Sequence, residues 1–216
     1  MSPGTHGGQK GLTLLETIVA SSLLLLVLGG VLGVLRSGTD TYAVGITKAD
    51  VDSHARNLVD TIAEALVYSG NAVMLPASAS PLSSSTITYQ ESTGFSGGVL
   101  RWGNPLTIEF VIDAGELDDD RDNDGNGLVD EGMVVRRETL PSGETREVVL
   151  TRWVREYLEG EVPNGADDNG NGLVDERGLC FERNGDVWTV RATIERRDAD
   201  GRLLTCTADT TVRPRN

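Results

Sequence analysis

The sequence predicts an α+β protein in which one long N-terminal helix packs on a mostly antiparallel β-sheet. Three observations lead to this fold class. An uncharged apolar run fills residues 17–35, a helical stripe of apolar residues follows in residues 51–66, and short β-branched segments separated by turn residues fill most of the remainder. Two acidic segments, at residues 118–132 and 164–177, interrupt the strand-like part and are expected to form inserted loops.

The composition limits the size and the partners of the folded part. The 216 residues suit one domain of ordinary size with an appendage, or two small domains. A formal net charge of −14 argues against binding of nucleic acid through its phosphates, so no basic nucleic-acid patch is expected. The two cysteines, Cys180 and Cys206, form neither a CxxC motif nor a Cys/His cluster, which argues against a zinc site.

The N-terminal apolar segment is long enough to cross a membrane. Residues 17–35 rise about 28 Å as an α-helix at roughly 1.5 Å per residue, close to the ~30 Å hydrocarbon core of a bilayer. A cleaved secretory signal peptide has a shorter apolar centre and a small-residue cleavage site, which the following "LRSGTDTYA" does not provide. Glu16 lies at the start of this segment, where an unpaired carboxylate is costly to bury, so it should have a partner or a function.

The segment "GLTLLE", from Gly11 to Glu16, followed by the apolar run resembles the class III signal of type IV pilins and type II secretion pseudopilins. In that family a prepilin peptidase cuts after the glycine and methylates the new N-terminus, which here would be Leu12 in place of the usual Phe. The resemblance implies a leader at residues 1–11 and a transmembrane and assembly helix at residues 12–36. It also implies an assembly role for Glu16, because the matching acid of the family neutralises the N-terminal amine of a neighbouring subunit.

The same resemblance implies a location and partners. The chain would be a single-pass protein of the inner membrane, with its head in the periplasm or outside the cell, and would later be associated with a fibre. Its partners would be other pilins or pseudopilins, the prepilin peptidase and the inner-membrane assembly platform.

The N-terminal helix is expected to continue over residues 37–75 after a break suggested by "RSGTD". Gly70 in "YSGN" can take the left-handed conformation that ends a helix. His54, the only histidine after the expected leader, is interpreted as a surface residue and not as a catalytic base. Apolar residues at helical spacing predict the face that packs on the head: Val51, Ala55, Leu58, Ile62 and Leu66.

Residues 76–216 are expected to form the β-rich head. After a Ser/Pro/Ala-rich linker, residues 76–86, short segments rich in β-branched and aromatic residues predict strands. Hairpins are expected around Pro141–Gly143 and around the turn "DADG" at Asp198–Gly201. This order of elements resembles PilW-like minor pilins and J-type minor pseudopilins. Alternation in the strand before the second turn places four residues on one side: Trp188, Val190, Ala192 and Ile194.

The acidic segment "DRDNDGNGLVDE" has the spacing of a calcium loop, D-x-[DN]-x-[DN]-G-x5-E. Ca2+ binds six to eight hard oxygen atoms at ~2.3–2.6 Å, which alternating carboxylates around a glycine turn can supply. Two alignments with this motif are open. The ligands of the first are Asp120, Asp122, Asp124 and Glu131. Those of the second are Asp122, Asp124, Asn126, Asp130 and Glu131.

The chain repeats the pattern forty-five residues later as "DDNGNGLVDE". Gly165 stands where the first alignment needs an Asp, so the second alignment is favoured for this copy. The two copies predict one or two structural Ca2+ ions and not an EF-hand sensor, because no long helices flank the loops. The alternative is a pair of exposed acidic turns that bind nothing specific. The expected ligands of the second copy are Asp167, Asn169, Asn171, Asp175 and Glu176.

The cysteines are interpreted through the compartment that the family resemblance implies. Outside the inner membrane, two cysteines on neighbouring strands are expected to be bridged, which predicts a disulfide between Cys180 and Cys206. Such a bridge would close a loop of about 27 residues and contribute about 3–4 kcal/mol in the chain-entropy description. Two buried thiols are the alternative.

Three function classes are open. The first, which the sequence favours, is a non-enzymatic structural subunit: a minor pilin or minor pseudopilin that helps to initiate or cap a type II secretion pseudopilus or a type IV pilus. The second is a calcium-stabilised adhesin or ligand-binding head displayed on such a fibre. The third is an anchored periplasmic enzyme, which is disfavoured because the sequence contains no Ser/His/Asp, Cys/His or HExxH constellation.

Overall fold

The computed structural model describes residues 13–70, 74–76 and 82–215, so the expected processing residues Gly11 and Leu12 lie outside the described part. The chain divides into two compact units, Met1–Val44 and Gly45–Asn216. The described residues confirm the α+β class, because helix α1 (Leu14–Val67) is followed by strands that pair in antiparallel fashion.

Within the first unit, α1 presents apolar side chains that nothing covers among the described residues. Leu15 is 72% exposed, Leu26 is 74% exposed and Leu35 is 60% exposed. The helix is long and apolar enough to span a membrane.

The break expected at "RSGTD" is wrong, because α1 continues through this segment. Thr39 Oγ1 donates a hydrogen bond to the carbonyl of Arg36 at 2.8 Å, and Thr41 Oγ1 donates to that of Ser37 at 2.8 Å. These hydroxyls bond back to the preceding turn and so do not compete for the backbone outside the helix. Gly38 weakens the helix by only about 1 kcal/mol relative to Ala, which its neighbours can offset.

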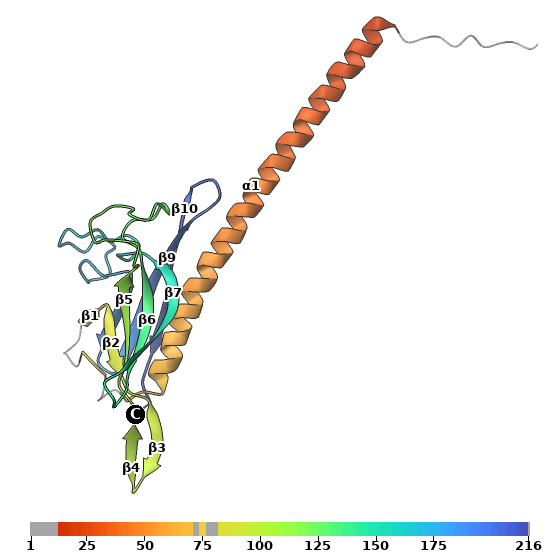
Figure 1. Cartoon of the computed structure of the whole chain (residues 1–216). Helices are drawn as coiled ribbons and strands as arrows, with labels where there is room; N and C mark the ends of the chain where they lie inside the picture. The colour runs from red at the N-terminus through yellow and green to blue at the C-terminus, as the bar shows by residue number, and fades with distance from the viewer. Residues whose placement is uncertain (1–12, 71–73, 77–81, 216) are drawn as a thin grey trace, which may run out of the picture. The chain divides into compact units, whose positions relative to one another are not determined.

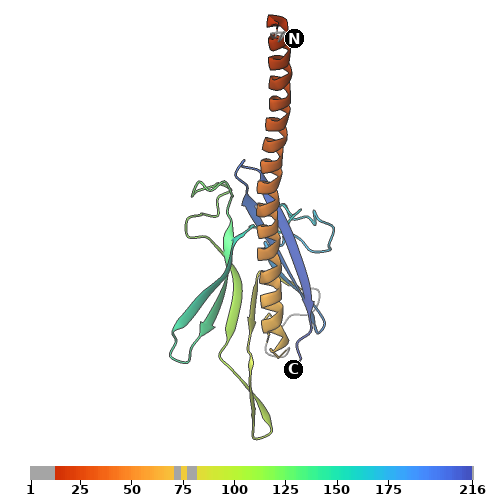
Figure 2. The same cartoon turned by 90° about the vertical axis from the view of Figure 1, so that its right-hand side faces the viewer.

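Within the second unit, the C-terminal part of α1 packs on one face of the sheet (Figures 1 and 2). Each fully buried aliphatic side chain in such a position contributes about 1.5–3 kcal/mol. The helical stripe expected from the sequence is confirmed, and all five of its members are at most 2% exposed: Val51, Ala55, Leu58, Ile62 and Leu66.

The end of α1 differs from the expectation. The helix ends at Val67, where the backbone N–H and the hydroxyl of Ser69 both donate to the carbonyl of Leu66. Gly70 is not in the left-handed conformation that was expected to end the helix. Its lack of a side chain serves packing, since a Cβ at this position would lie 2.3 Å from a ring carbon of Trp102.

The described strands form an eight-stranded antiparallel sheet in the order β1-β8-β9-β7-β6-β5-β2, and β10 pairs with the other side of β9. A separate two-stranded sheet consists of β3 and β4. The strands that lead from the linker to the centre of the head are β1 (Leu82–Ser84), β2 (Thr86–Tyr89), β3 (Ser92–Ser96), β4 (Val99–Trp102) and β5 (Leu106–Ile112). The remaining strands are β6 (Gly132–Thr139), β7 (Thr145–Val154), β8 (Leu179–Asn184), β9 (Val187–Arg197) and β10 (Leu203–Val212).

Both predicted hairpins are confirmed. Strands β6 and β7 pair from Thr139 opposite Thr145, around the expected turn at Pro141–Gly143. Strands β9 and β10 pair along their whole length, and Gly201 in the connecting turn has a φ of 79°, which favours glycine. The expected alternation in β9 is also confirmed, with four fully buried residues facing the core: Trp188, Val190, Ala192 and Ile194.

The linker expected over residues 76–86 is only partly correct. Residues 77–81 lie outside the described part, but Leu82–Ser84 forms β1 and Thr86 begins β2. Strand β1 pairs with β8, about a hundred residues later in the chain. A strand of three residues is too short to show an alternating pattern, and it forms here because it pairs with a distant segment of the chain.

The predicted disulfide between Cys180 and Cys206 is wrong, because both cysteines are free. Cys180 lies on β8 opposite Arg191, and Cys206 lies on β10 opposite Ile194. Strand β9 therefore separates the two by two strand spacings of about 4.8 Å each. Since residues 191 and 194 of β9 point to opposite faces of the sheet, the two thiols also point to opposite faces, where a disulfide cannot join them.

Both thiols are expected to react slowly with a thiol reagent in the native protein. Burial raises the pKa of Cys180 and that of Cys206 to about 11, so less than about one thiol in a hundred is the reactive thiolate at pH 8. Labelling with an aromatic disulfide should therefore be at least about a hundredfold slower in the native protein than in the denatured protein. Fewer than two reactive thiols after denaturation without a reductant would contradict the free cysteines.

Candidate metal centres and the start of the helix

The first acidic loop connects β5 to β6, and its middle is shaped by Asp122. The two carboxylate oxygens of Asp122 accept hydrogen bonds from the backbone N–H groups of Gly125, at 2.6 Å, and Gly127, at 2.9 Å. Both glycines have positive φ values, 78° and 89°, which residues with a Cβ rarely adopt. Asp122 thus holds a tight turn whose conformation depends on glycine.

This turn brings together the carboxylates of Glu116, Asp124 and Glu131, each with an oxygen within 4.8 Å of the others. We call this group the first acidic cluster. Oxygen atoms bound to one Ca2+ at ~2.3–2.6 Å can lie up to about 5 Å apart, so the cluster has the size of a cation site. Glu116 is only 5% exposed and Glu131 only 3% exposed.

The first acidic cluster has no opposite charge to pair with among the described residues, and one of its oxygens lacks a hydrogen-bond partner. Glu131 Oε1 accepts a short hydrogen bond from the Asn126 amide, whereas Glu131 Oε2 is buried and has no hydrogen-bond partner among the described residues. Burial raises the pKa of Glu131, against the effect of the Asn126 hydrogen bond. None of the ion pairs in the described ranges involves a member of the cluster. The three carboxylates offer hard oxygen atoms, one of which is buried and accepts no hydrogen bond among the described residues. Such a group could hold a metal ion.

A second group of three carboxylates, Asp118, Asp130 and Glu156, also has oxygens within 4.8 Å of one another. Unlike the first acidic cluster, it includes an ion pair. The buried Asp130 accepts hydrogen bonds from the backbone N–H groups of Asp119, at 3.3 Å, and Asp120, at 2.6 Å. Glu156 forms an ion pair with Arg177, which lowers its pKa, although burial raises that pKa more strongly.

The second acidic loop connects β7 to β8 and folds like the first. Asp167 accepts hydrogen bonds from the N–H groups of Gly170, at 2.7 Å, and Gly172, at 2.8 Å, as Asp122 does from its two glycines. Asp175 accepts from the N–H groups of Asn164 and Gly165, as Asp130 does from the two residues at the matching positions. Figure 1 shows the two loops leaving the same end of the sheet.

Comparison of the two loops explains a difference in their sequences. Asp120 has a φ of 58°, and the matching Gly165 has a φ of 77°. The position is therefore a left-handed turn, for which glycine is suited and Asp is tolerated. Asp120 belongs to neither group of three carboxylates, so the structure gives no support to the alignment in which it is the first ligand.

The structure brings together only part of the expected ligand set. Asp124, Asp130 and Glu131 lie in the two groups of carboxylates, whereas Asp122 and Asn126 shape the loop through hydrogen bonds. In the second loop, Asn171 donates to Glu176 Oε1 at 2.6 Å, and its own carbonyl oxygen accepts from the N–H of Leu173.

The ligand sets expected from the sequence did not include Glu116, Asp118 and Glu156. Asp118 and Glu156 come together only through the fold, but Glu116 had a signal in the sequence. The dipeptide Gly-Glu occurs at Gly115–Glu116 and again forty-five residues later, before the second loop. A Cβ at Gly115 would lie 3.1 Å from Asp124 Cβ, so a larger residue there would push on the ligand-bearing turn.

The start of α1 gives Glu16 a partner within its own chain. Thr13 Oγ1 accepts a hydrogen bond from the backbone N–H of Glu16 at 3.3 Å, and the Glu16 carboxylate accepts from the backbone N–H of Thr13 at 3.3 Å. This reciprocal pair is a capping box, which the sequence "TLLE" could have indicated. The capping box satisfies backbone donors of the first turn but leaves the negative charge of Glu16 without an opposite charge among the described residues.

His54 lies on the surface, as expected. Its side chain is 41% exposed, its Nε2 atom is 3.6 Å from Asp50, and its ring contacts the edge of Trp153. The contact with Trp153 connects α1 to β7 within the head, so His54 has a packing role.

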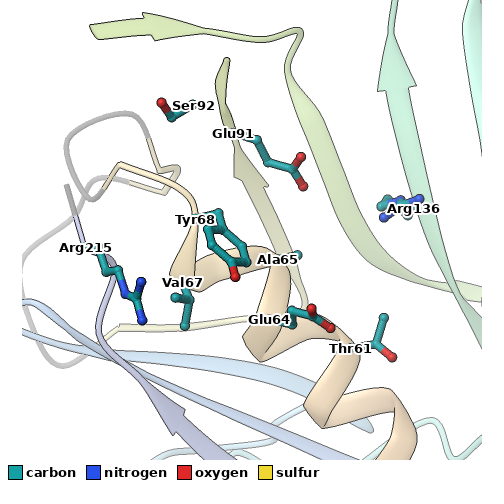
Figure 3. A pocket seen from close by; sticks show the side chains of 9 residues that line it. All are labelled: Thr61, Glu64, Ala65, Val67, Tyr68, Glu91, Ser92, Arg136 and Arg215. Carbon is teal, nitrogen blue, oxygen red and sulfur yellow. The ribbon is translucent and has the colours of Figure 1, made fainter. Parts of the chain in front are cut away.

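A cavity of about 580 Å³ lies at the C-terminal end of α1, within the second unit (Figure 3). Tyr68 is among the residues that line it. The charged lining residues are two acids and two bases: Glu64, Glu91, Arg136 and Arg215. The opposite charges balance, so this cavity lacks the excess of carboxylates that distinguishes the acidic loops.

Comparison of the chain with family models, with characterised proteins and with solved structures finds no match. The function must therefore be argued from the residues themselves.

Proposed function

We propose that this chain is a minor subunit of a type II secretion pseudopilus or of a type IV pilus, anchored in the inner membrane before assembly. The observation that carries the proposal is α1 itself. In its first part the helix exposes apolar side chains and carries the lone charge Glu16 in its first turn, and in its last part it forms the core of an antiparallel head. A plain membrane anchor could use Glu16 to cap its helix, but it has no use for the uncompensated charge.

Processing would supply the opposite charge that Glu16 lacks. A cut after Gly11 creates the α-amino group of Leu12, a positive charge four residues before Glu16. Within the capping box, the Glu16 carboxylate accepts hydrogen bonds at Oε2 and keeps its negative charge. It can therefore still pair with the amine of a neighbouring subunit. In a bilayer such a pair is favoured because each charge alone is costly to bury.

We further propose that the cation of the first acidic cluster is Ca2+. All three side chains offer carboxylate oxygen, which suits a hard cation that accepts irregular geometry. A head outside the inner membrane meets Ca2+ near millimolar concentration, which fills even sites of modest affinity. The ion would act as a structural clamp between β5 and β6.

The processing step tests the proposal directly. Mass spectrometry of the membrane form is expected to show loss of residues 1–11 and a methylated Leu12 as the first residue. Gly11→Val should block this cleavage, because the peptidase must accommodate the residue at the cut, whereas Gly8→Val in the same leader should be processed normally. An intact leader in the wild type, or cleavage beyond Leu35, would overturn the proposed family of fibre subunits.

A further inference from the structure

The two acidic loops share more than the "GNGLVDE" segment. Each loop is preceded by a Gly-Glu pair at the same distance, Gly115–Glu116 in the first and Gly160–Glu161 in the second. Gly160 packs as Gly115 does, since a Cβ there would lie 3.2 Å from Asn169 Cβ. The repeated unit therefore extends from the Gly-Glu pair to the closing acid, and Glu161 is the counterpart of Glu116.

Glu161 is buried inside the second loop. It is 1% exposed, its Oε1 atom accepts a hydrogen bond from the N–H of Asn169 at 2.9 Å, and its Oε2 atom accepts from the N–H of Asp175 at 3.2 Å. Glu116 likewise accepts from the N–H of Asp124 at 2.9 Å. These bonds place the Glu161 carboxylate beside residue 169 and beside the residue that precedes Glu176.

Glu176 supplies an independent sign of a missing positive partner. The residue is 2% exposed, and its Oε1 atom accepts from Asn171 Nδ2 at 2.6 Å. Its Oε2 atom is buried and has no hydrogen-bond partner among the described residues, as is true of Oε2 of Glu131 in the first loop. A buried carboxylate oxygen without a partner is costly, so its recurrence at matching positions points to a ligand that both loops bind.

We propose that Glu161, Asn169 and Glu176 form a second divalent-cation site, equivalent to the first acidic cluster but weaker. The inference rests on the proposed Ca2+ role of the first loop. It assigns to the second loop a set of ligands that differs from the set expected from the motif spacing. Asn169 offers a neutral carbonyl oxygen where the first loop has the carboxylate of Asp124. Because the affinity of a Ca2+ site depends on the number of charged ligands, the second site binds more weakly. Asp167 and Asp175 hold the loop and do not bind the ion.

Calcium titration calorimetry of the full-length protein in detergent micelles tests this inference. The wild type is expected to bind two Ca2+ ions with different affinities. Asn169→Asp should tighten the weaker site on the order of tenfold, since it restores the third carboxylate. Glu161→Gln should remove the weaker site and leave the tighter one, whereas Glu116→Gln should do the reverse. A gain of affinity in Asn169→Asp cannot result from misfolding.

Asp168→Asn is the matched control, because Asp168 is an exposed neighbour of Asn169 that donates no oxygen to the proposed site. It should leave both affinities within about twofold of the wild type. One bound ion that is lost only in Glu116→Gln would overturn the second site and leave the Ca2+ role of the first loop intact. An unchanged weaker affinity in Asn169→Asp would likewise overturn it. The failure of the wild type to bind any Ca2+ would overturn both proposals.

Discussion

Glu16→Gln is expected to lower the recovery of the protein in sheared fibres by at least about tenfold, while its level in the inner membrane stays the same. Removal of one partner from a buried ion pair costs about 3–5 kcal/mol, and 1.4 kcal/mol already changes an equilibrium about tenfold. Gln at this position can still complete a capping box, so the start of α1 remains intact. The substitution therefore removes the charge and keeps the local structure.

Thr13→Ala is the matched control, because it removes the capping hydroxyl and keeps the charge of Glu16. Loss of this cap should cost about 1 kcal/mol of helix stability at the N-terminus, with fibre recovery close to that of the wild type. The two variants separate the two roles of Glu16. Normal fibre recovery for Glu16→Gln together with a loss for Thr13→Ala would show that Glu16 acts as a helix cap and not as an assembly contact.

Removal of Ca2+ is expected to lower the melting temperature of the full-length protein in detergent micelles. At a free Ca2+ concentration of about 100 times Kd, each site stabilises the native state by about 2.7 kcal/mol. For a domain of this size, this corresponds to a shift of about 5–11 °C per site. Without the ion, the buried carboxylates of Glu116 and Glu131 and the exposed carboxylate of Asp124 remain close together and repel one another.

Asp124→Ala should reproduce most of the effect of chelation at the first loop, and further chelation should then change its melting temperature less than that of the wild type. Glu144→Gln, in the exposed turn between β6 and β7, removes one negative charge far from the cluster in sequence and should respond to chelation like the wild type. A wild-type melting temperature that does not change with EDTA or added Ca2+ would leave the acidic loops as ordinary solvated turns.

The parts of the fold that the sequence predicted are those encoded by local periodicity. The stripe from Val51 to Leu66 lies in one helix, and the alternation from Trp188 to Ile194 lies in one strand. Each pattern arises because a single element turns one side toward the core. The strand order could not be predicted in this way, because the neighbours of β9 come from before and after it in the chain. The expected disulfide was wrong for the same reason, since an oxidising compartment says nothing about the sheet face on which a cysteine lies.

The acidic loops show a similar division. The motif spacing located both loops, because the alternating acids and glycines are contiguous in sequence. It did not identify Glu116 and Glu161, which lie outside the motif and enter the loops only when the chain folds back on itself. A search for repeats that extended beyond "GNGLVDE" would have found the Gly-Glu pairs.

The place of β9 and β10 in the sheet also determines when the head can fold during synthesis. The stripe of α1 is made early, but the strands that cover it include β9 and β10, and Val212 at the end of β10 belongs to the same core. Contacts between such distant parts of a chain form slowly. A chain that is synthesised from its N-terminus therefore carries an uncovered apolar helix face until β10 has been made, and a truncation that removes β10 should leave a protein prone to aggregation and proteolysis.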